Sequence, residues 1–255
     1  MNGYGMTDMG LKRQNNEDAI WVSNEPVGPL PNLYIVSDGM GGHSAGEVAS
    51  RRGIDFFCEA LRSAGPAFQD GCAAEGLDIL DILVGAINVT NTKVFNLSRQ
   101  TESFHGMGAT FLACVLAGGK IYAAHVGDSR AYVALEGELS QITSDHSLVN
   151  EMLKAGEITK EEAKTHPRRN VITRALGTAE TVNIDGVVLN VQGSGILLLC
   201  TDGLSNMVPD GEILAVLNGE GTVPEKCERL IEMAKKYGGD DNISVVLVPI
   251  NEVIV

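Results

Sequence analysis

The sequence predicts an α+β protein in which two mainly antiparallel sheets pack face to face and helices cover them from outside. Short apolar runs are separated by glycine-containing connections of the kind found in β-hairpins. Longer segments repeat apolar residues at helical spacing. The chain has 255 residues, of which 44% are hydrophobic and 20% charged, so it can bury a large core without disulfides.

The predicted strands follow one another as short apolar runs. In chain order they are Leu33–Ser37, Ala109–Leu116, Ile121–Val126, Ala131–Leu135, Leu139–Ile142, Val187–Val191, Ile196–Cys200 and Ile243–Val248. Gly118-Gly119, Glu136-Gly137 and Gln192–Gly195 separate three successive pairs of these runs. Such short connections predict three hairpins, and hairpins make the sheets mainly antiparallel.

Three long helices and two short ones are predicted from periodicity and caps. The long helices are Ala45–Leu61, Leu77–Leu97 and Pro224–Tyr237; the last begins with proline and ends before two glycines. Short helices are expected after Ser144-Asp145 and after Thr159, where Thr159 and Glu162 have the spacing of a capping box. We find no linker or repeat and expect a single domain, residues 1–255.

The charge and cysteine content exclude several functions. The chain carries 19 Lys and Arg against 33 Asp and Glu, a net charge of −14, which argues against nucleic acid or an anionic membrane as partner. Its five cysteines form no CxxC pair, which favours free thiols in a reducing compartment. We see no signal peptide and no apolar run long enough to span a membrane, and we expect a cytoplasmic monomer.

Aspartates recur where apolar strands end or begin. Asp38, Asp128 and Asp202 each follow a predicted strand, and Asp241 precedes the last one. Any one of them alone is explained by turn chemistry. Together they would crowd like charges unless a cation lies among them. Oxygen ligands without a Cys/His set predict a hard ion such as Mg²⁺, Mn²⁺ or Ca²⁺.

Two polar segments lie near these aspartates in the sequence. The segment 8–18 contains Arg13 and Asp18. It is either a solvated loop or a phosphate-binding segment with Arg13 as a guanidinium fork and Asp18 directed at bound water. The glycine-rich segment 38–43 leads into a helix but lacks the lysine of a P-loop. Its glycines allow the backbone to approach a ligand or a metal.

These motifs, taken in order, resemble those of the metal-dependent PP2C-type (PPM) serine/threonine phosphatases, in particular the compact bacterial branch. The resemblance covers about Thr7 to Val248. The motifs that carry it are Arg13 to Asp18, Asp38-Gly39-Met40-Gly41-Gly42-His43, Gly106-Met107-Gly108-Ala109-Thr110, Ala124-His125-Val126-Gly127-Asp128-Ser129-Arg130, Thr143-Ser144-Asp145-His146, His166-Pro167-Arg168-Arg169-Asn170, Arg174-Ala175-Leu176-Gly177, Cys200-Thr201-Asp202-Gly203 and Gly238-Gly239-Asp240-Asp241-Asn242.

The resemblance implies a four-layer α-β-β-α sandwich with a metal site at one edge. Asp38 would bridge two Mn²⁺ or Mg²⁺ ions; Asp202 and Asp241 would complete one ion and the Gly39 carbonyl the other. Asp18 would hold metal-bound water or ligate weakly. Asp128 would help to hold a weaker third ion, sharing Asp202. The same resemblance makes Arg13 the phosphate ligand and lets Asn242 orient Asp241 or a nearby loop.

The proton donor to the leaving group is less defined. Animal-type members of the family carry histidine directly after Asp-Gly, whereas this chain has Met40 there and its histidine at His43. His43 and metal-bound water are equal candidates for the general acid. Residues 147–166 correspond to the flap of relatives, and are read either as a surface helical hairpin or as a substrate-selecting lid. His125, His146 and His166 are interpreted as structural.

The predicted function is hydrolysis of phosphoserine and phosphothreonine in proteins by a metal-bridging water. Partners implied by the family are phosphorylated proteins, among them a serine/threonine kinase and its substrates. A catalytically weak member serving as a regulatory scaffold is one alternative, although Asp18, Asp38, Asp202 and Asp241 are all present. A phosphatase of small phosphoesters is the other.

Overall fold

Two antiparallel sheets form the centre of the computed structural model, which describes residues 2–42, 45–63 and 78–250. The first sheet has the order β1 (Tyr4–Asp8), β11 (Ile243–Ile250), β10 (Gly195–Cys200), β7 (Arg130–Leu135) and β8 (Glu138–Gln141). The second has the order β2 (Asp18–Ser23), β3 (Leu33–Met40), β5 (Phe111–Ala117), β6 (Lys120–Val126) and β9 (Asp185–Asn190), with β4 (Gly108–Ala109) pairing β3.

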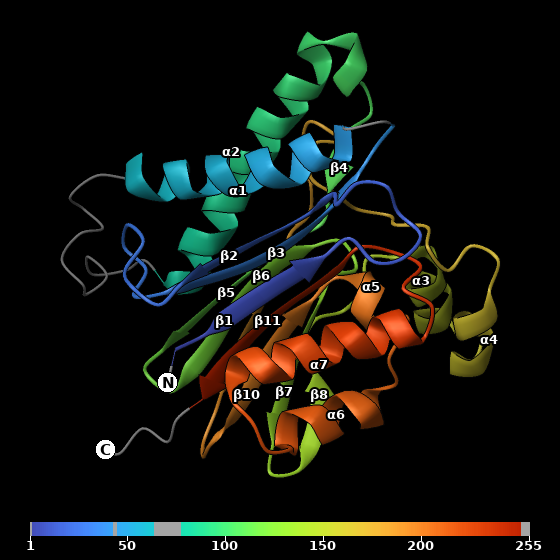
Figure 1. Cartoon of the computed structure of the whole chain (residues 1–255). Helices are drawn as coiled ribbons and strands as arrows, with labels where there is room; N and C mark the ends of the chain where they lie inside the picture. The colour runs from blue at the N-terminus through green and yellow to red at the C-terminus, as the bar shows by residue number, and fades with distance from the viewer. Residues whose placement is uncertain (1, 43–44, 64–77, 251–255) are drawn as a thin grey trace.

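Helices cover the outer face of each sheet. The second sheet packs against α1 (Ala45–Ser63) and α2 (Ile79–Gln100), and the first against α6 (Asp210–Asn218) and α7 (Val223–Lys236). Figure 1 shows the resulting four layers, the α-β-β-α sandwich that the sequence predicts. The short helices α3 (Leu148–Lys154), α4 (Lys160–Thr165) and α5 (Asp202–Ser205) gather at one end of it. A 3₁₀ turn, Glu102–Phe104, follows α2.

The core lies in three layers because the central strands are buried on both faces. In β10, Leu198 and Cys200 pack toward α6 and α7, while Leu197 and Leu199 pack between the sheets. Successive side chains of a strand point to opposite faces, so a strand between two apolar layers reads as a continuous apolar run. This is why the run Ile196–Cys200 shows no polar alternation.

Two of the three predicted hairpins are present and one prediction is wrong. β5 pairs with β6 and β7 with β8, as the glycine connections indicate. The runs around Gln192–Gly195 do not form a hairpin: β9 pairs with β6 in the second sheet, and β10 pairs with β7 and β11 in the first. β10 is apolar on both faces and needs a central place, whereas the half-buried β9 suits an edge.

Other elements differ from the sequence prediction in extent or were missed. α5 and α6 were not predicted, and neither was the edge strand β1, which precedes the polar segment 8–18. The capping boxes at Thr159 and Thr222 are both formed, and the first confirms the predicted start of α4. In the described part of the chain, no helix combines the length and apolar character required to cross a membrane.

Candidate metal centre and active site

Five aspartates converge at the end of the sandwich where α3–α5 lie. Asp18 begins β2 and stands opposite Asp38 in the β2–β3 register. Asp128 follows β6, Asp202 opens α5 with one residue between it and the end of β10, and Asp241 precedes β11. We call this set the carboxylate cluster: Asp18, Asp38, Asp128, Asp202 and Asp241. The structure therefore brings together all the aspartates that the sequence predicted as metal ligands.

Burial and mutual repulsion dominate the electrostatics of the carboxylate cluster. Burial, partly opposed by hydrogen bonds, raises the pKa of Asp18 to about 7. Burial and the nearby Asp202 raise the pKa of Asp128 to about 8. Burial, Asp18, Asp202, Asp128 and Asp241 together raise the pKa of Asp38 far above its usual range. Asp38 is therefore close enough to all four other carboxylates to be repelled by each of them, so it lies at the centre of the carboxylate cluster.

The donor atoms fit hard divalent cations. Asp18 Oδ1 and Asp202 Oδ1 are buried and have no hydrogen-bond partner within the described ranges. An unpaired buried carboxylate oxygen is costly unless a proton or a cation compensates it. All the cluster side chains offer oxygen, the donor that Mg²⁺ and Mn²⁺ prefer. The carboxylate cluster is thus suited to these ions.

Neighbouring backbone and side chains hold Asp18 and Asp241 in place. Asp18 Oδ2 accepts hydrogen bonds from Ser244 Oγ at 2.6 Å and Thr201 Oγ1 at 2.8 Å. Both hydroxyls were missed by the sequence analysis. The signal for Ser244 is a lone polar residue in the apolar run Ile243–Val248. The backbone amide of Asn242 donates to Asp241 Oδ1 at 2.8 Å.

Asn242 ties the polar segment 8–18 to the start of β11. Its Nδ2 donates to the Met9 and Asn15 carbonyls, both at 2.9 Å, and its Oδ1 accepts from the Glu17 amide at 2.8 Å. A buried side chain with three such bonds fixes the loop that carries Arg13. The orienting role that the resemblance implied for Asn242 thus has a structural basis.

Arg13 reaches the edge of the carboxylate cluster but is bound to one of its members. Arg13 Nη2 lies 2.7 Å from Asp241 Oδ2, and the arginine side chain is 51% exposed. The two residues line a hollow of about 190 Å³ together with Arg169 and Asp202. The guanidinium therefore stands at the protein surface beside the carboxylate cluster.

Gly39 lies so close to neighbouring backbone that no side chain would fit at this position. A Cβ there would lie less than 3 Å from the carbonyl oxygens of Gly46 and Glu17, and the Gly39 amide donates to the Glu17 carbonyl at 3.1 Å. Glu17, an acidic residue the sequence analysis left unassigned, packs against Gly46 in the first turn of α1. His43, the candidate general acid, lies outside the described residues.

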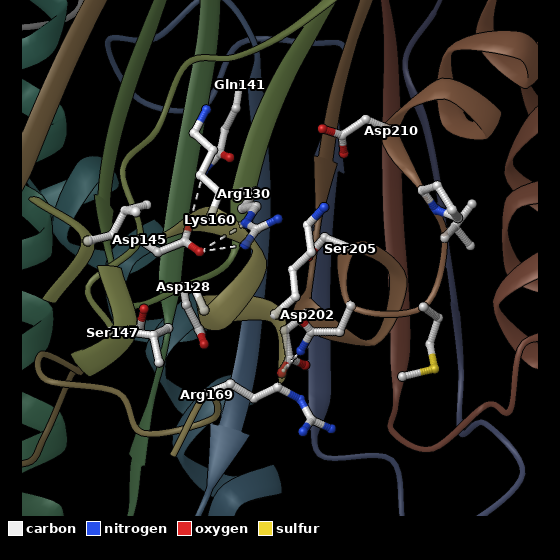
Figure 2. Close-up of a pocket in the computed structure, with 18 residues that line it drawn as sticks. Asp128, Arg130, Gln141, Asp145, Ser147, Lys160, Arg169, Asp202, Ser205 and Asp210 are labelled. Carbon is white, nitrogen blue, oxygen red and sulfur yellow. Dashed lines mark hydrogen bonds and ion pairs between the residues drawn. The ribbon is translucent and has the colours of Figure 1, made fainter. Parts of the chain in front are cut away.

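A cavity of about 630 Å³ opens beside the carboxylate cluster, between α5–α6 and the short helices α3 and α4. Asp128 and Asp202 line it together, with Lys160, Lys164 and Arg169 also in its wall. Figure 2 shows Arg130 bound to Asp145 on the same side as Asp128; the Nη2–Oδ2 distance is 2.7 Å. The cavity wall thus places positively charged side chains next to the carboxylates.

A second cluster of possible metal ligands lies at the end of β6, which carries His125. Donor atoms of His125, His146 and Asp185 all lie within 4.8 Å of one another. However, His146 Nδ1 accepts a hydrogen bond from the Gly127 amide at 3.1 Å, so its proton sits on Nε2, which faces Asp185 Oδ2 at 3.1 Å. His125 Nε2 lies 3.1 Å from the Ser144 carbonyl. Among the described residues, His125 Nδ1 and His146 Nε2 complete no hydrogen bond, so the donor atoms of this histidine cluster also suit a metal ion. The structural interpretation of the two histidines stays a prediction.

Sequence comparison identifies relatives along nearly the whole chain. The protein phosphatase 2C family profile matches residues 11–247. The serine/threonine phosphatase stp of Listeria monocytogenes is 40% identical over 252 residues, covering 97% of this chain and 95% of its own length. Protein phosphatase PhpP of Streptococcus pneumoniae is 36% identical, covering 97% of this chain and 96% of its own.

Solved structures agree in fold. A bacterial serine phosphatase superimposes with a TM-score of 0.90 at 34% identity, covering both chains fully. The catalytic domain of the serine/threonine phosphatase PstP in complex with two manganese ions superimposes with a TM-score of 0.80 at 34% identity, covering 98% of each chain. The chain therefore belongs to the protein phosphatase 2C family, among its bacterial serine/threonine phosphatases.

Proposed function

We propose that the carboxylate cluster is the active site through which this phosphatase hydrolyses phosphoserine and phosphothreonine in proteins. The observation that supports this most is the convergence of five aspartates from separate elements, with two unpaired buried oxygens among the described residues. Burial raises the pKa values of Asp18, Asp38, Asp128 and Asp202. A structural cluster would pair its charges. This one concentrates negative charge where a cation-dependent reaction needs it.

Asp38 is proposed to be shared by two Mn²⁺ or Mg²⁺ ions, with Asp202 and Asp241 completing one and the Gly39 carbonyl serving the other. Asp128, beside Asp202 in the cavity wall, is proposed to hold a weaker third ion. When bound, two such ions would supply positive charge for the phosphate and would acidify a water for use as the nucleophile.

The chain's own residues bind and orient the phosphate. Arg13 supplies a guanidinium at the cluster edge, and its bond to Asp241 holds it there. Charge-assisted contacts from arginine to phosphate are both strong and directional. Lys160 and Lys164 of the flap, with Arg169, line the adjacent cavity. In a protein of charge −14, this local cationic wall would attract an anionic phosphopeptide.

The proposed substrates are phosphoproteins, including a serine/threonine kinase and its targets, by analogy with the family. Four buried free cysteines, Cys58, Cys114, Cys200 and Cys227, agree with a reducing, cytoplasmic location. A regulatory scaffold without activity would not require the full carboxylate cluster. Small phosphoesters fit the same chemistry and are separated from phosphoproteins by experiment.

The test measures phosphate release from phosphoserine, phosphothreonine and phosphotyrosine peptides and from p-nitrophenyl phosphate, with Mn²⁺, Mg²⁺ or a chelator. We expect turnover of the first two peptides with either metal and none with the chelator. Asp38→Ala should be inactive, whereas Asp55→Ala, an exposed aspartate on α1, should match the unchanged protein. Equal activity with and without chelator would exclude the proposal. Activity on p-nitrophenyl phosphate alone would favour small phosphoesters.

A further inference from the structure

A row of hydroxyl groups crosses three neighbouring strands of the first sheet at the level of the carboxylate cluster. Thr7 of β1 stands opposite Ser244 of β11 in the strand register, and their hydroxyl oxygens lie 2.8 Å apart. On the other side of β11, the Ser244 amide donates to Thr201 Oγ1 at 3.0 Å, just after β10. We call Thr7, Ser244 and Thr201 the hydroxyl row.

The hydroxyl row ends on a carboxylate of the opposite sheet. Ser244 and Thr201, both fully buried, donate to the same oxygen, Oδ2 of Asp18 in β2. Asp18 is itself 3% exposed, and its other oxygen, Oδ1, has no partner among the described residues. Oδ2 of Asp18 is thus held by two hydrogen bonds, while Oδ1 is available to bind a group in the carboxylate cluster.

The direction of every proton in the row is fixed by its neighbours. Asn16 Nδ2 donates to Thr7 Oγ1 at 2.9 Å, and Asn16 Oδ1 accepts from the Asp18 amide at 3.2 Å. The Thr7 hydroxyl therefore donates its own proton in the hydrogen bond to Ser244 Oγ, because the Ser244 hydroxyl donates to Asp18 Oδ2. Thr201, which accepts from the Ser244 amide, also donates to Asp18. All hydroxyl protons point toward the carboxylate.

A donor row of this kind favours one charge and one orientation of Asp18. Hydrogen bonds donated to a carboxylate stabilise its anionic form, whereas burial alone favours the neutral form. Two donors on Oδ2 also prevent the carboxylate from rotating about its terminal torsion, which is otherwise soft. Ser244 is the one polar side chain in the otherwise apolar strand β11. Thr201 stands at the N-cap position of α5, yet its side chain makes no capping hydrogen bond and is directed at Asp18 instead.

We propose that the hydroxyl row Thr7–Ser244–Thr201 is a positioning device of the active site, which fixes Asp18 with Oδ2 toward the row and Oδ1 toward the carboxylate cluster. The proposal rests on the proposed function of the cluster, because the orientation of Asp18 matters for turnover only if the cluster binds cations. Thr201 and Ser244 are the direct positioning residues. Thr7 and Asn16 act through Ser244 and bring the row to the protein surface.

The experiment compares Thr201→Val, which removes the hydroxyl at nearly constant shape, with Thr201→Ser, which keeps it. Mn²⁺ affinity is measured by calorimetry, and kcat and KM with a phosphothreonine peptide. We expect Thr201→Val to lower kcat and to weaken Mn²⁺ binding, each by about tenfold, with little change in KM. Thr201→Ser should retain most of both. Thr90→Val, which removes a buried hydroxyl within α2, is the control for stability loss alone.

A double-mutant cycle separates positioning from general support of the fold. In an Asp18→Asn background, Thr201→Val should have no further effect on Mn²⁺ affinity or kcat, because the orientation that it maintains is already lost. An equal effect of Thr201→Val in both backgrounds would overturn the proposal, as would Mn²⁺ affinity and kcat unchanged by Thr201→Val.

Thr7→Val and Thr7→Ser repeat the comparison at an exposed position of an edge strand, where folding is least at risk. We expect a smaller loss of kcat for Thr7→Val and near-complete retention for Thr7→Ser. Equal kcat and Mn²⁺ affinity for these two variants would remove Thr7 from the row. If Asp38→Ala instead kept its activity, the proposed function would fail, whatever the Thr201 variants show.

Discussion

Two buried polar clusters lie at the ends of neighbouring strands, and they handle charge in opposite ways. In the histidine cluster, the Gly127 amide, the Ser144 carbonyl and the Asp185 carboxylate each meet a complementary ring nitrogen, and the two rings stack with centroids 4.7 Å apart. The carboxylate cluster instead gathers groups of one sign, whereas Asp185 of the histidine cluster is also paired with Arg174 Nη1 at 2.7 Å. Among the described residues each cluster leaves two buried polar atoms without a hydrogen-bond partner: Asp18 Oδ1 and Asp202 Oδ1 in one, His125 Nδ1 and His146 Nε2 in the other. Close packing of possible ligands therefore says less about a metal site than uncompensated charge does.

The largest effect that would sharpen this contrast is expected at Asp38. Asp38→Asn keeps the shape of the side chain and removes the ionisable carboxyl on which all four other carboxylates act. Turnover should fall on the order of a thousandfold, and Mn²⁺ binding measured by calorimetry should lose at least one tight site. The metal-free protein should become more stable above about pH 4, because folding no longer has to protonate a buried carboxyl that is ionised in the unfolded chain. Two unchanged tight sites would contradict the central place of Asp38.

Asp128→Ala is expected to have a smaller and more selective effect. Its carboxylate lies in the cavity wall beside Asp202, so a cation there would have few protein ligands and bind weakly. Turnover of phosphopeptides should fall roughly tenfold while the two tight Mn²⁺ sites persist. Wild-type kcat throughout a millimolar Mn²⁺ titration would return Asp128 to a simple turn residue.

Arg13→Ala tests the only cation bonded to the carboxylate cluster among the described residues. Losing a charge-assisted phosphate contact should raise KM about tenfold. Mn²⁺ affinity should not fall, because the substitution removes a positive charge from beside Asp241. Steady-state kinetics at saturating metal measures the first effect and calorimetry the second. An unchanged kcat/KM would place Arg13 outside the site.

His146→Gln should leave chemistry intact and affect stability only. The substitution removes the ring stack and the contact with Asp185, at a cost of about 1–3 kcal/mol in the free energy of unfolding, measured by urea denaturation. Mn²⁺ stoichiometry and kcat should match those of the unchanged protein. The loss of one bound metal ion in this variant would show that the histidine cluster is a metal site, and the contrast between the clusters would fail.

Strand ends are easily located in a sequence, and they predicted the grouping of Asp38, Asp128, Asp202 and Asp241. Asp18 came instead from the polar segment 8–18 and from the family resemblance. The sequence did not predict the hydroxyl row, because Thr7, Ser244 and Thr201 come from three segments, and only the sheet order β1-β11-β10 makes them neighbours. The wrong hairpin around Gln192–Gly195 has a similar cause. Turn residues specify a local reversal, but the choice between two sheets depends on which edge remains open and which faces need covering.

The most direct test of the carboxylate cluster as a cation site is the pH dependence of the protein's free energy of unfolding. The folded-state pKa values lie at about 7 for Asp18, about 8 for Asp128 and about 6 for Asp202, all raised by burial before any other cause. An acid with a raised pKa binds more protons when folded, so its contribution to stability is complete below its unfolded pKa, near 4, and is lost as the pH rises through the folded value.

The measurement is the free energy of unfolding from pH 4 to pH 9, with chelator and with Mn²⁺. With chelator, the contribution of the carboxylate cluster should decline between about pH 4 and pH 8. Mn²⁺, which binds the deprotonated folded form, should cancel this decline and stabilise the protein most at the alkaline end. Asp38→Asn should respond much less to Mn²⁺. Identical pH profiles with and without Mn²⁺ would contradict the account.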